Sequence, residues 1–266
     1  LKAKNRVLDR PSFEVLMPYS AHHKSPKIVA LMIGRSGSTL VDKNILPVHG
    51  VPLLHYTAAA AKRSKYLGRF YVSSDDDKIL SVASQAGYKK ISRPKELSQP
   101  DSSSVDVVNH ALKIIEEDGP VDILVLQHAN VATITEKMID DCIEELMSSN
   151  TYSSVVPSHV VQDNHPYRVR KLNAEGMLEP FFDFSGQKIS ANRQHLPVCM
   201  AFDHSFWVLS VERGIRSVDG QQPWTCMGNR IKPYITEGSF DVHDLDDLKR
   251  TEKWLSENNI PTPEFN

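Results

Sequence analysis

The chain has 266 residues, of which 40% are hydrophobic and 24% are charged. This composition is typical of a globular protein, and the length suffices for one large α/β domain or for a domain with a small appendage. The formal net charge of -2 at pH 7 excludes the strongly basic character of a nucleic-acid-binding domain. We therefore expect no nucleic-acid partner.

Residues 1–25 are predicted to form an N-terminal extension, because they carry many charged residues and no long apolar run. This pattern indicates neither a signal peptide nor a membrane span. Three cysteines, Cys142, Cys199 and Cys226, are widely scattered and form no CxxC pair, and their odd number argues against a disulfide framework. We expect a protein of a reducing compartment, the cytoplasm, with no membrane partner.

Strands and helices alternate along the first half of the predicted domain, which spans residues 26–266. Short apolar runs predict strands, and amphipathic stretches predict helices. In chain order we expect strand 28–33, helix 52–66, strand 69–73, helix 78–86, helix 105–117, strand 121–127, helix 136–149 and strand 153–157. This alternation predicts an α/β fold with a mostly parallel sheet and helices on both of its faces.

The pattern changes after residue 158. Residues 159–200 contain short segments separated by turn signals, which favour strands and hairpins over long helices. We interpret this stretch as a β-rich arm inserted into the α/β domain. The chain then returns to the main sheet through residues 201–211 and 231–235, and residues 245–257 predict a final amphipathic helix.

The loop after the first strand carries the strongest functional signal. Glycines let backbone N–H groups approach an anion closely, and fixed cations neutralise its charge. The residues that fit phosphate binding are Gly34, Arg35, Ser36, Gly37, Ser38, Lys43 and Asn44. The loop matches neither the Walker motif nor the dinucleotide-binding motif, whose further glycines and lysine it lacks. The alternative is a solvated surface loop with two ordinary cations.

Two further groups of polar residues follow predicted strands. Arg93 lies where open α/β sheets place ligands, and one of the serines at 102–104 is expected to cap the next helix or to contact a base or ribose. Asp241 and Asp244 precede the last helix, where carboxylates suit a hard divalent cation but can equally cap the helix. The scattered histidines show no metal-ligand spacing, and we assign them no mechanism.

Together these motifs resemble the acylneuraminate cytidylyltransferase family, which includes the CMP-sialic acid synthetases. The resemblance runs from about residue 28 to about residue 254. Its markers, in the order of the family, are residues 34–38, 43–44, 72–76, 93–97, 103–104, 127, 165–166, 192–197 and 240–242. Each motif alone is weak, whereas the ordered set is specific.

The resemblance implies a Rossmann-like nucleotidyltransferase domain whose arm builds a homodimer and closes over the partner's site. By this resemblance, Arg35, Ser36 and Lys43 hold the CTP triphosphate, Arg93 and Ser104 contact the cytidine, Gln127 and Arg193 lie on the sugar side, and Asp241 holds Mg²⁺. His243 stands where the family has its second metal-binding aspartate. Because hard cations prefer oxygen ligands, Asp244 is the candidate to replace that aspartate.

The implied reaction is nucleotidyl transfer from CTP. The anomeric hydroxyl of a 2-keto-3-deoxy sugar acid, such as a sialic, legionaminic or pseudaminic acid, attacks the α-phosphate, and pyrophosphate leaves. Arg35, Lys43 and Asp241 with Mg²⁺ are the candidate catalytic groups, because this chemistry consists mostly of positioning and charge neutralisation.

Two alternatives stay open. The first is an enzyme that uses another nucleoside triphosphate or another sugar. The second is a degenerate, non-catalytic relative that binds nucleotide or sugar, which is favoured by departures from the family pattern at Thr39, His128, Cys199 and His243.

Overall fold

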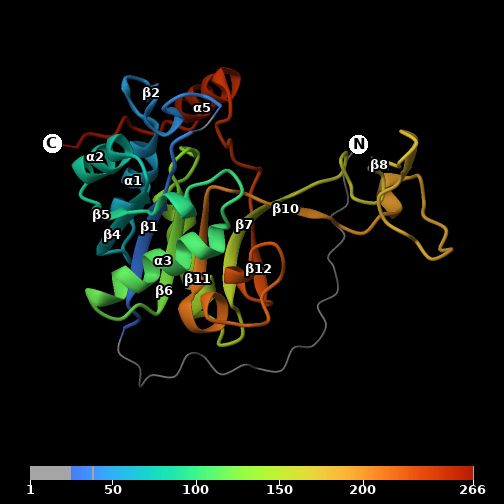
Figure 1. Cartoon of the computed structure of the whole chain (residues 1–266), viewed down its shortest axis with the longest axis horizontal. Helices are drawn as coiled ribbons and strands as arrows, with labels where there is room; N and C mark the ends of the chain where they lie inside the picture. The colour runs from blue at the N-terminus through green and yellow to red at the C-terminus, as the bar shows by residue number, and fades with distance from the viewer. Residues whose placement is uncertain (1–24, 38, 266) are drawn as a thin grey trace, which may run out of the picture.

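A computed structural model describes residues 25–37 and 39–265 of the chain. The N-terminal extension predicted for residues 1–25 lies outside the described residues except for Ser25, and so does Ser38 of the phosphate loop. The described chain folds around a sheet of eight strands, and an arm projects from one end of this sheet (Figure 1).

The central sheet is mixed, with a parallel half and an edge that contains antiparallel strands. Its strands are β1 (Ile28–Ile33), β4 (Arg69–Ser74), β5 (Lys89–Ser92), β6 (Ile123–His128), β7 (Ser154–Val160), β10 (Met200–Phe202), β11 (Phe206–Ser210) and β12 (Ile231–Ile235). The order is β10-β7-β11-β6-β1-β4-β5, and β12 also pairs with β7. β6, β1, β4 and β5 run parallel, as do β7 and β12, whereas β10 and β11 run antiparallel to their neighbours.

Helices cover both faces of this sheet, as the alternation predicts. They are α1 (Leu53–Arg63), α2 (Asp77–Gln85), α3 (Ser104–Glu117), α4 (Glu136–Met147) and α5 (Leu245–Glu257). α3 packs on one face, where Ile115 contacts a cluster that includes Leu31. α1, α2 and α4 cover the other face, where Ala30 and Met32 of the same strand are buried. Successive side chains of β1 therefore point to opposite layers, as a strand buried on both faces requires.

Local capping explains where most of these helices begin. Asp76, Ser103 and Thr135 each accept a hydrogen bond from a backbone N–H in the first turn of α2, α3 and α4. Such caps satisfy donors that the helix itself leaves without partners. Ser103 thus caps α3, and the side chain of Ser104, the first helical residue, does not take part in the cap.

The last helix fixes the chain that precedes it. α5 packs through Leu255 on Val48 of a small hairpin, formed by β2 (Pro47–Val48) and β3 (Val51–Pro52), and on Leu53 at the start of α1. The same cluster contains Val242. The segment before α5, which includes Asp241, is thereby held next to the carboxyl end of β6, where the backbone N–H of Val242 donates to the carbonyl of Asn130 at 3.2 Å.

The arm contains less regular strand than the turn signals predict. Between β7 and β10 the chain forms one hairpin, of β8 (Arg170–Leu172) and β9 (Leu178–Pro180), and a single 3₁₀ turn over Arg193–His195. In Figure 1 the arm extends away from the layered domain. Short strands outside the main sheet cannot bury a core of their own, so the arm remains largely irregular.

The predicted return strand 201–211 is interrupted in the structure. β10 ends at Phe202 and β11 begins at Phe206, and the buried Asp203 and a bend at His204 and Ser205 separate them. This break sets Asp203 at the root of the arm.

Candidate active site

Six of the predicted nucleotide-binding residues line one hollow at the carboxyl ends of β1, β5 and β6. This hollow has a volume of about 210 Å³. The predicted residues that line it are Gly34, Arg35, Lys43, Asn44, Arg93 and Ser104, and they are joined by His128 and Asn130. Parallel strands present their carboxyl ends at the same edge of a sheet, and open α/β sheets bind ligands there.

Ser36 does not offer its donors to this hollow. Its backbone N–H and its hydroxyl both donate to the carboxylate of Asp75, at 3.0 Å and 2.5 Å. Burial opposes the ionisation of Asp75, but the hydrogen bonds from Ser36 outweigh it and hold the pKa of this carboxyl below its ordinary value. Ser36 and Gly37 instead line a smaller hollow on the other side of the loop. Ser36 therefore fastens the loop to Asp75, and Arg35, Lys43 and Asn44 also line this smaller hollow. A contact of Ser36 with the phosphates stays a prediction.

Lys43 lies near three charged side chains in this site, Arg35, Asp241 and Asp247. Burial lowers the pKa of its ammonium group, and nearby Arg35 lowers it further, whereas Asp241 and Asp247 act in the opposite direction. Asn44 is buried, and its Nδ2 donates to the carbonyl of Arg35 at 3.3 Å. Asn44 therefore holds the loop in shape, while Arg35 and Lys43 supply two cations at the hollow.

Arg93 connects the ends of two strands beneath the loop. Its guanidinium is buried and donates to the carbonyls of Gly34 and Ser73, at 2.9 Å and 2.5 Å. Burial lowers the pKa of Arg93 to about 10, so the group still carries its charge at neutral pH. Gly34 permits this packing, because a Cβ there would lie 3.1 Å from the Cβ of Ala129. Arg93 thus shapes the floor of the site as well as lining it.

The structure does not bring Gln127 to the hollow. Its side chain is fully buried on the opposite face of the sheet, where it accepts from the hydroxyl of Tyr88 at 2.8 Å and donates to the carbonyl of Thr57 at 2.9 Å. The next residue, His128, faces the hollow instead, because neighbouring side chains of a strand point to opposite faces. The side chain of Gln127 is thus engaged by Tyr88 and Thr57, and its contact with a sugar stays a prediction.

His128 is a functional candidate that the sequence patterns missed. Burial, together with nearby His204, lowers the pKa of His128 to about 3, so the imidazole is neutral at ordinary pH. Its Nδ1 is buried and has no hydrogen-bond partner among the described residues. The alternation of side-chain direction along a strand, which sets His128 on the face opposite to Gln127, is the signal that could have placed His128 at the hollow.

Asp241 lies beside the phosphate loop. Its carboxylate accepts a hydrogen bond from Nδ2 of Asn130, and Nε2 of His243 lies 3.6 Å from Oδ2. Burial raises the pKa of Asp241, although His243 and Lys43 oppose this effect. A partly buried carboxylate at the edge of the predicted phosphate site has the chemistry that Mg²⁺ prefers, since this ion usually takes one or two carboxylates and completes its shell with water and substrate phosphates.

Asp244 caps α5, which is the alternative to metal binding that the sequence predicts for it. Its Oδ1 accepts from the backbone N–H groups of Asp246 and Asp247, both at 2.9 Å. Among the described residues, no group of three histidine, cysteine, aspartate or glutamate side chains could hold a metal. A role for Asp244 in metal binding therefore stays a prediction.

Arg193 lies in the arm and is not among the residues that line the hollow. It is exposed, and its Nη1 is 3.4 Å from a carboxylate oxygen of Asp163, also in the arm.

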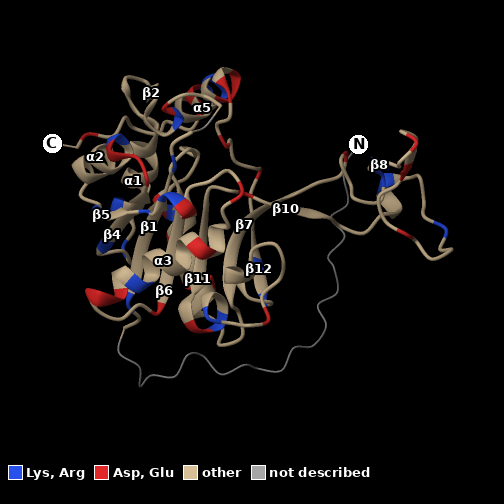
Figure 2. Cartoon of the chain, viewed as in Figure 1, with Lys and Arg blue, Asp and Glu red and all other residues tan. Residues whose placement is uncertain are grey.

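Figure 2 shows basic and acidic residues interspersed over the domain and the arm, in keeping with the small net charge. In the described part of the chain, no helix is both long enough and apolar enough to span a bilayer.

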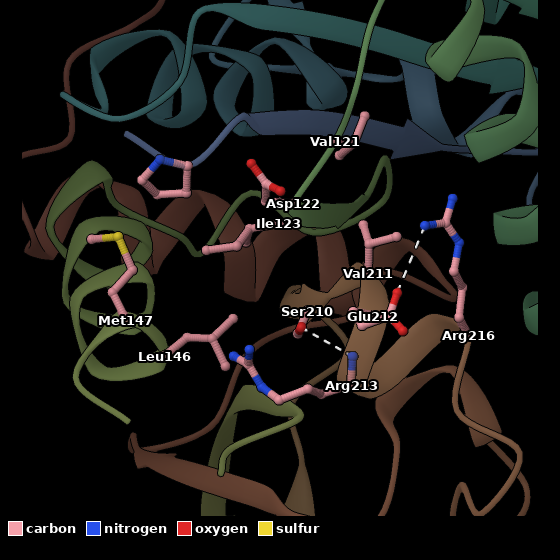
Figure 3. A pocket seen from close by; sticks show the side chains of 11 residues that line it. Val121, Asp122, Ile123, Leu146, Met147, Ser210, Val211, Glu212, Arg213 and Arg216 are labelled. Carbon is pink, nitrogen blue, oxygen red and sulfur yellow. Dashed lines mark hydrogen bonds and ion pairs between the residues drawn. The ribbon is translucent and has the colours of Figure 1, made fainter. Parts of the chain in front are cut away.

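A second hollow lies at the opposite edge of the sheet, where β1 and β6 begin (Figure 3). Its charged groups already have partners. Nε of Arg213 donates to the carbonyl of Tyr152 at 2.8 Å, and Arg216 pairs with Glu116 at 2.7 Å. Asp122, at its centre, accepts from the backbone N–H of Lys27 at 2.6 Å. This hollow is therefore a weaker candidate for binding a phosphate than the one that contains Arg35 and Lys43.

A comparison of sequences identifies the family. Residues 29–197 match the family described as cytidylyltransferase. The chain belongs to the cytidylyltransferase family. The match begins in β1 and ends in the arm, so it contains the phosphate loop, Arg93 and Ser104, but not Asp241.

Individual relatives agree with this assignment of a cytidylyltransferase. The chain is 31% identical over 154 residues to N-acylneuraminate cytidylyltransferase A of Danio rerio, covering 58% of this chain and 34% of that protein. It is 30% identical over 168 residues to N-acylneuraminate cytidylyltransferase of Escherichia coli O18:K1:H7, covering 62% of this chain and 39% of that protein. The chain thus matches well under half of the length of these curated relatives.

A solved structure shares the fold of this cytidylyltransferase. The structure of CMP:2-keto-3-deoxy-manno-octonic acid synthetase complexed with CTP superposes with a TM-score of 0.63, and the match covers 87% of this chain and 99% of that chain. At 13% sequence identity, this likeness concerns the fold alone.

Proposed function

We propose that this cytidylyltransferase transfers CMP from CTP to the anomeric hydroxyl of a 2-keto-3-deoxy sugar acid and releases pyrophosphate. The observation that carries the proposal is the convergence of Arg35, Lys43 and Asp241 at one edge of the sheet in a member of this family. The names of the two curated relatives, both N-acylneuraminate cytidylyltransferases, support a sugar acid as the acceptor.

Charge neutralisation is the main contribution that we assign to the loop. Arg35 and Lys43 bind the triphosphate, and its negative charge favours the protonated form of Lys43 against the effect of burial. Arg93 and Asn44 hold the loop in position through their hydrogen bonds to the carbonyls of Gly34 and Arg35. Such preorganised cations stabilise the charge that develops when pyrophosphate leaves.

Magnesium is the metal that we propose for this site, with Asp241 as its ligand. Mg²⁺ bound there supplies a further positive charge to the phosphates. Asn130 orients the Asp241 carboxylate by donating to one of its oxygens. Asp244 would be a second candidate ligand, because its cap of α5 uses only Oδ1.

The arm supports a homodimer as the working form of the enzyme. Several large apolar side chains of the arm are exposed, namely Leu172, Met177, Leu178, Phe181 and Phe182. Exposed apolar patches of this kind mark protein interfaces. We propose that a second copy covers them and that Arg193 reaches the sugar acid in the site of that copy.

We also propose a reducing, cytoplasmic location for the enzyme. The cysteines Cys142, Cys199 and Cys226 are all free in the structure, and two of them are buried. Free buried thiols are common in proteins that remain in a reducing compartment.

Pyrophosphate release tests the proposed function. CTP, UTP, GTP and ATP are each combined with Mg²⁺ and with a panel of sialic, legionaminic, pseudaminic and 3-deoxy-octulosonic acids. We expect release only with CTP and with at least one of these acids. Release with another triphosphate would point to a different nucleotidyltransferase. CTP binding without release from any pair would favour a non-catalytic relative.

A further inference from the structure

A buried carboxylate orients one histidine at the root of the arm. Nδ1 of His159, in β7, lies 2.6 Å from Oδ1 of Asp203. Asp203 is almost completely buried, and its other oxygen accepts from the hydroxyl of Thr236 at 2.5 Å. Because an ionised carboxylate can only accept hydrogen bonds, Nδ1 of His159 carries the proton and Nε2 keeps a free lone pair.

The fold brings these three residues together. Asp203 directly follows β10 and Thr236 directly follows β12, and both strands pair with β7 next to His159. The indole Nε1 of Trp207 donates to the carbonyl of Asp203 at 3.3 Å. The histidine is therefore held by rigid sheet residues rather than by the irregular part of the arm, as a catalytic group requires.

The open side of His159 faces the same hollow as Asp241. Its side chain is 35% exposed, in contrast to 1% for Asp203. The charged and titratable groups that line this hollow with His159 are Glu237, Asp241, His243, Asp247 and Arg250. Arg250 lies over the ring of Phe240, 4.7 Å from its centroid, and its Nη1 is 3.4 Å from Oδ1 of Asp247. The hollow thus adjoins the phosphate site through Asp241 and is suited to the acceptor.

We propose that His159 is the general base that takes the proton from the anomeric hydroxyl of the sugar acid, and that Asp203 is its positioning residue. This inference rests on the proposed function. As the proton moves to Nε2 of His159, the sugar oxygen forms a bond to the α-phosphorus of CTP. The bond from that phosphorus to the bridging oxygen of the β-phosphate breaks, and pyrophosphate leaves with the electron pair. His159 then returns its proton to water.

Other groups near the site are less suited to this role. His128 has a pKa of about 3, which makes it a weak base at neutral pH. Burial lowers the pKa of His204 as well. Asp241 is the proposed ligand of the metal. His159 combines access to the acceptor hollow with a carboxylate that fixes the orientation of its ring and leaves Nε2 free.

The competing interpretation is that the His159–Asp203–Thr236 network only fastens the arm to the sheet. The two interpretations differ in what loss of the imidazole does. A fastening role affects stability and dimer formation, whereas a base affects kcat and its dependence on pH. A general base typically contributes about 10²- to 10⁴-fold to the rate.

The first experiment compares His159→Gln with His49→Gln. His49 is an exposed histidine of the β2–β3 hairpin whose Nε2 lies 3.1 Å from the carbonyl of Glu252. We expect kcat for CMP transfer to fall about 10²- to 10⁴-fold in His159→Gln. CTP affinity measured by calorimetry and the melting temperature are expected to stay close to wild type. His49→Gln should keep wild-type kcat.

Imidazole rescue separates a base from a fastener. His159→Gly leaves space for free imidazole, and added imidazoles of rising basicity should restore the rate in proportion to their basicity. Wild-type kcat should rise through an ionisation that is absent from the His159→Gln profile. Asp203→Asn should lower kcat at least tenfold while retaining CTP binding.

A spectroscopic measurement gives a readout independent of turnover. Nitrogen spectra of protein with ¹⁵N-labelled histidine should show His159 with its proton on Nδ1, and Asp203→Asn should disturb this tautomer. The base assignment is overturned if active wild type loses no kcat on changing His159 to Gln, if imidazole gives no rescue in folded His159→Gly, or if Nε2 carries the proton. Failure of the proposed function looks different, because wild type itself then releases no pyrophosphate.

Discussion

Single side chains at the carboxyl edge of the sheet divide into those that shape the site and those that remain available to a ligand. Arg93 is buried, and its guanidinium donates hydrogen bonds to backbone carbonyls at the strand ends. Arg35 is only partly buried, and its Nη1 makes one hydrogen bond, to the carbonyl of Ser36 at 3.1 Å. A change at Arg35 should therefore affect catalysis far more than folding.

We predict that Arg35→Ala lowers kcat for CMP transfer by about 10²- to 10³-fold, because one well-aimed cation is worth a few kcal/mol in the transition state. The free energy of unfolding, measured in urea, should change by less than about 0.5 kcal/mol, as for other substitutions at partly exposed positions. Arg63→Ala is the matched control, since Arg63 pairs with Glu136 on the helical layer. Near-normal turnover of Arg35→Ala would remove the loop from the mechanism.

His128 predicts a pH dependence of stability. The unfolded chain titrates this imidazole at a pKa of about 6.5, whereas burial lowers the pKa to about 3 in the folded protein. Below about pH 6.5 the unfolded state binds a proton that the folded state does not. The stability associated with neutral His128 is therefore complete above this pH and is lost as the pH falls towards about 3.

Urea unfolding between about pH 7 and about pH 4 measures this effect. Wild type should lose stability more steeply on acidification than His128→Gln, by up to about 1.4 kcal/mol per pH unit. His49→Gln is the control and should keep the wild-type slope, because that histidine is exposed. Equal slopes for wild type and His128→Gln would show that His128 is accessible to protons in the folded state.

The phosphate loop and the end of β6, at Gln127 and His128, differ in how well the sequence predicts their side-chain positions. Gly34, Arg35, Lys43 and Asn44 could be placed together, because they belong to one loop after one strand. The burial of Gln127 away from the hollow could not be predicted, because the face to which a strand side chain points depends on its packing partners. Gln127 has two hydrogen-bond partners, Thr57 and Tyr88, and both are distant from it in the sequence.

Among the secondary-structure elements, regular strands and helices were predictable, whereas the arm was predictable only in outline. The observed α5, Leu245–Glu257, matches its prediction, because an apolar face and an aspartate cap define it locally. The strands of the arm are three residues each, too short for a period to be read. The break at Asp203 escaped prediction because it depends on His159 and Thr236, which lie elsewhere in the chain.

The exposed apolar side chains of the arm lead to a prediction about assembly. We expect Phe181→Asp with Leu178→Asp to convert a homodimer to monomers while the α/β domain stays folded, because a charge in a desolvated interface is costly. Sedimentation velocity measures the oligomeric state, and circular dichroism measures the fold. Val218→Asp is the control, since Val218 is 95% exposed and lies outside the arm. A dimer that survives the double substitution would contradict an interface on the β8–β9 hairpin.

The fold as a whole presents two edges with different chemistry. At the carboxyl edge of the parallel strands, Arg35 and Lys43 lie beside a hollow, with Asp241 close to Lys43. At the amino edge, Nε of Arg213 donates to the carbonyl of Tyr152, and Arg216 pairs with the carboxylate of Glu116. The layered sheet separates the two edges, so ligand binding at one edge should leave the other unaffected.

Amide hydrogen exchange with and without CTP and Mg²⁺ tests this asymmetry. Amide hydrogens exchange when the structure opens locally. A ligand that binds only the folded state makes this opening rarer at its own site and so slows exchange there. We expect protection in residues 34–44, 93–104 and 128–130, and no change in residues 119–123 and 211–216. UTP at the same concentration is the control for recognition of the base. We expect UTP to protect residues 34–44 more than residues 93–104, because the triphosphate contacts the first segment and the base contacts the second. Protection centred on residues 211–216 would place the nucleotide at the amino edge and would refute the phosphate loop as its binding site.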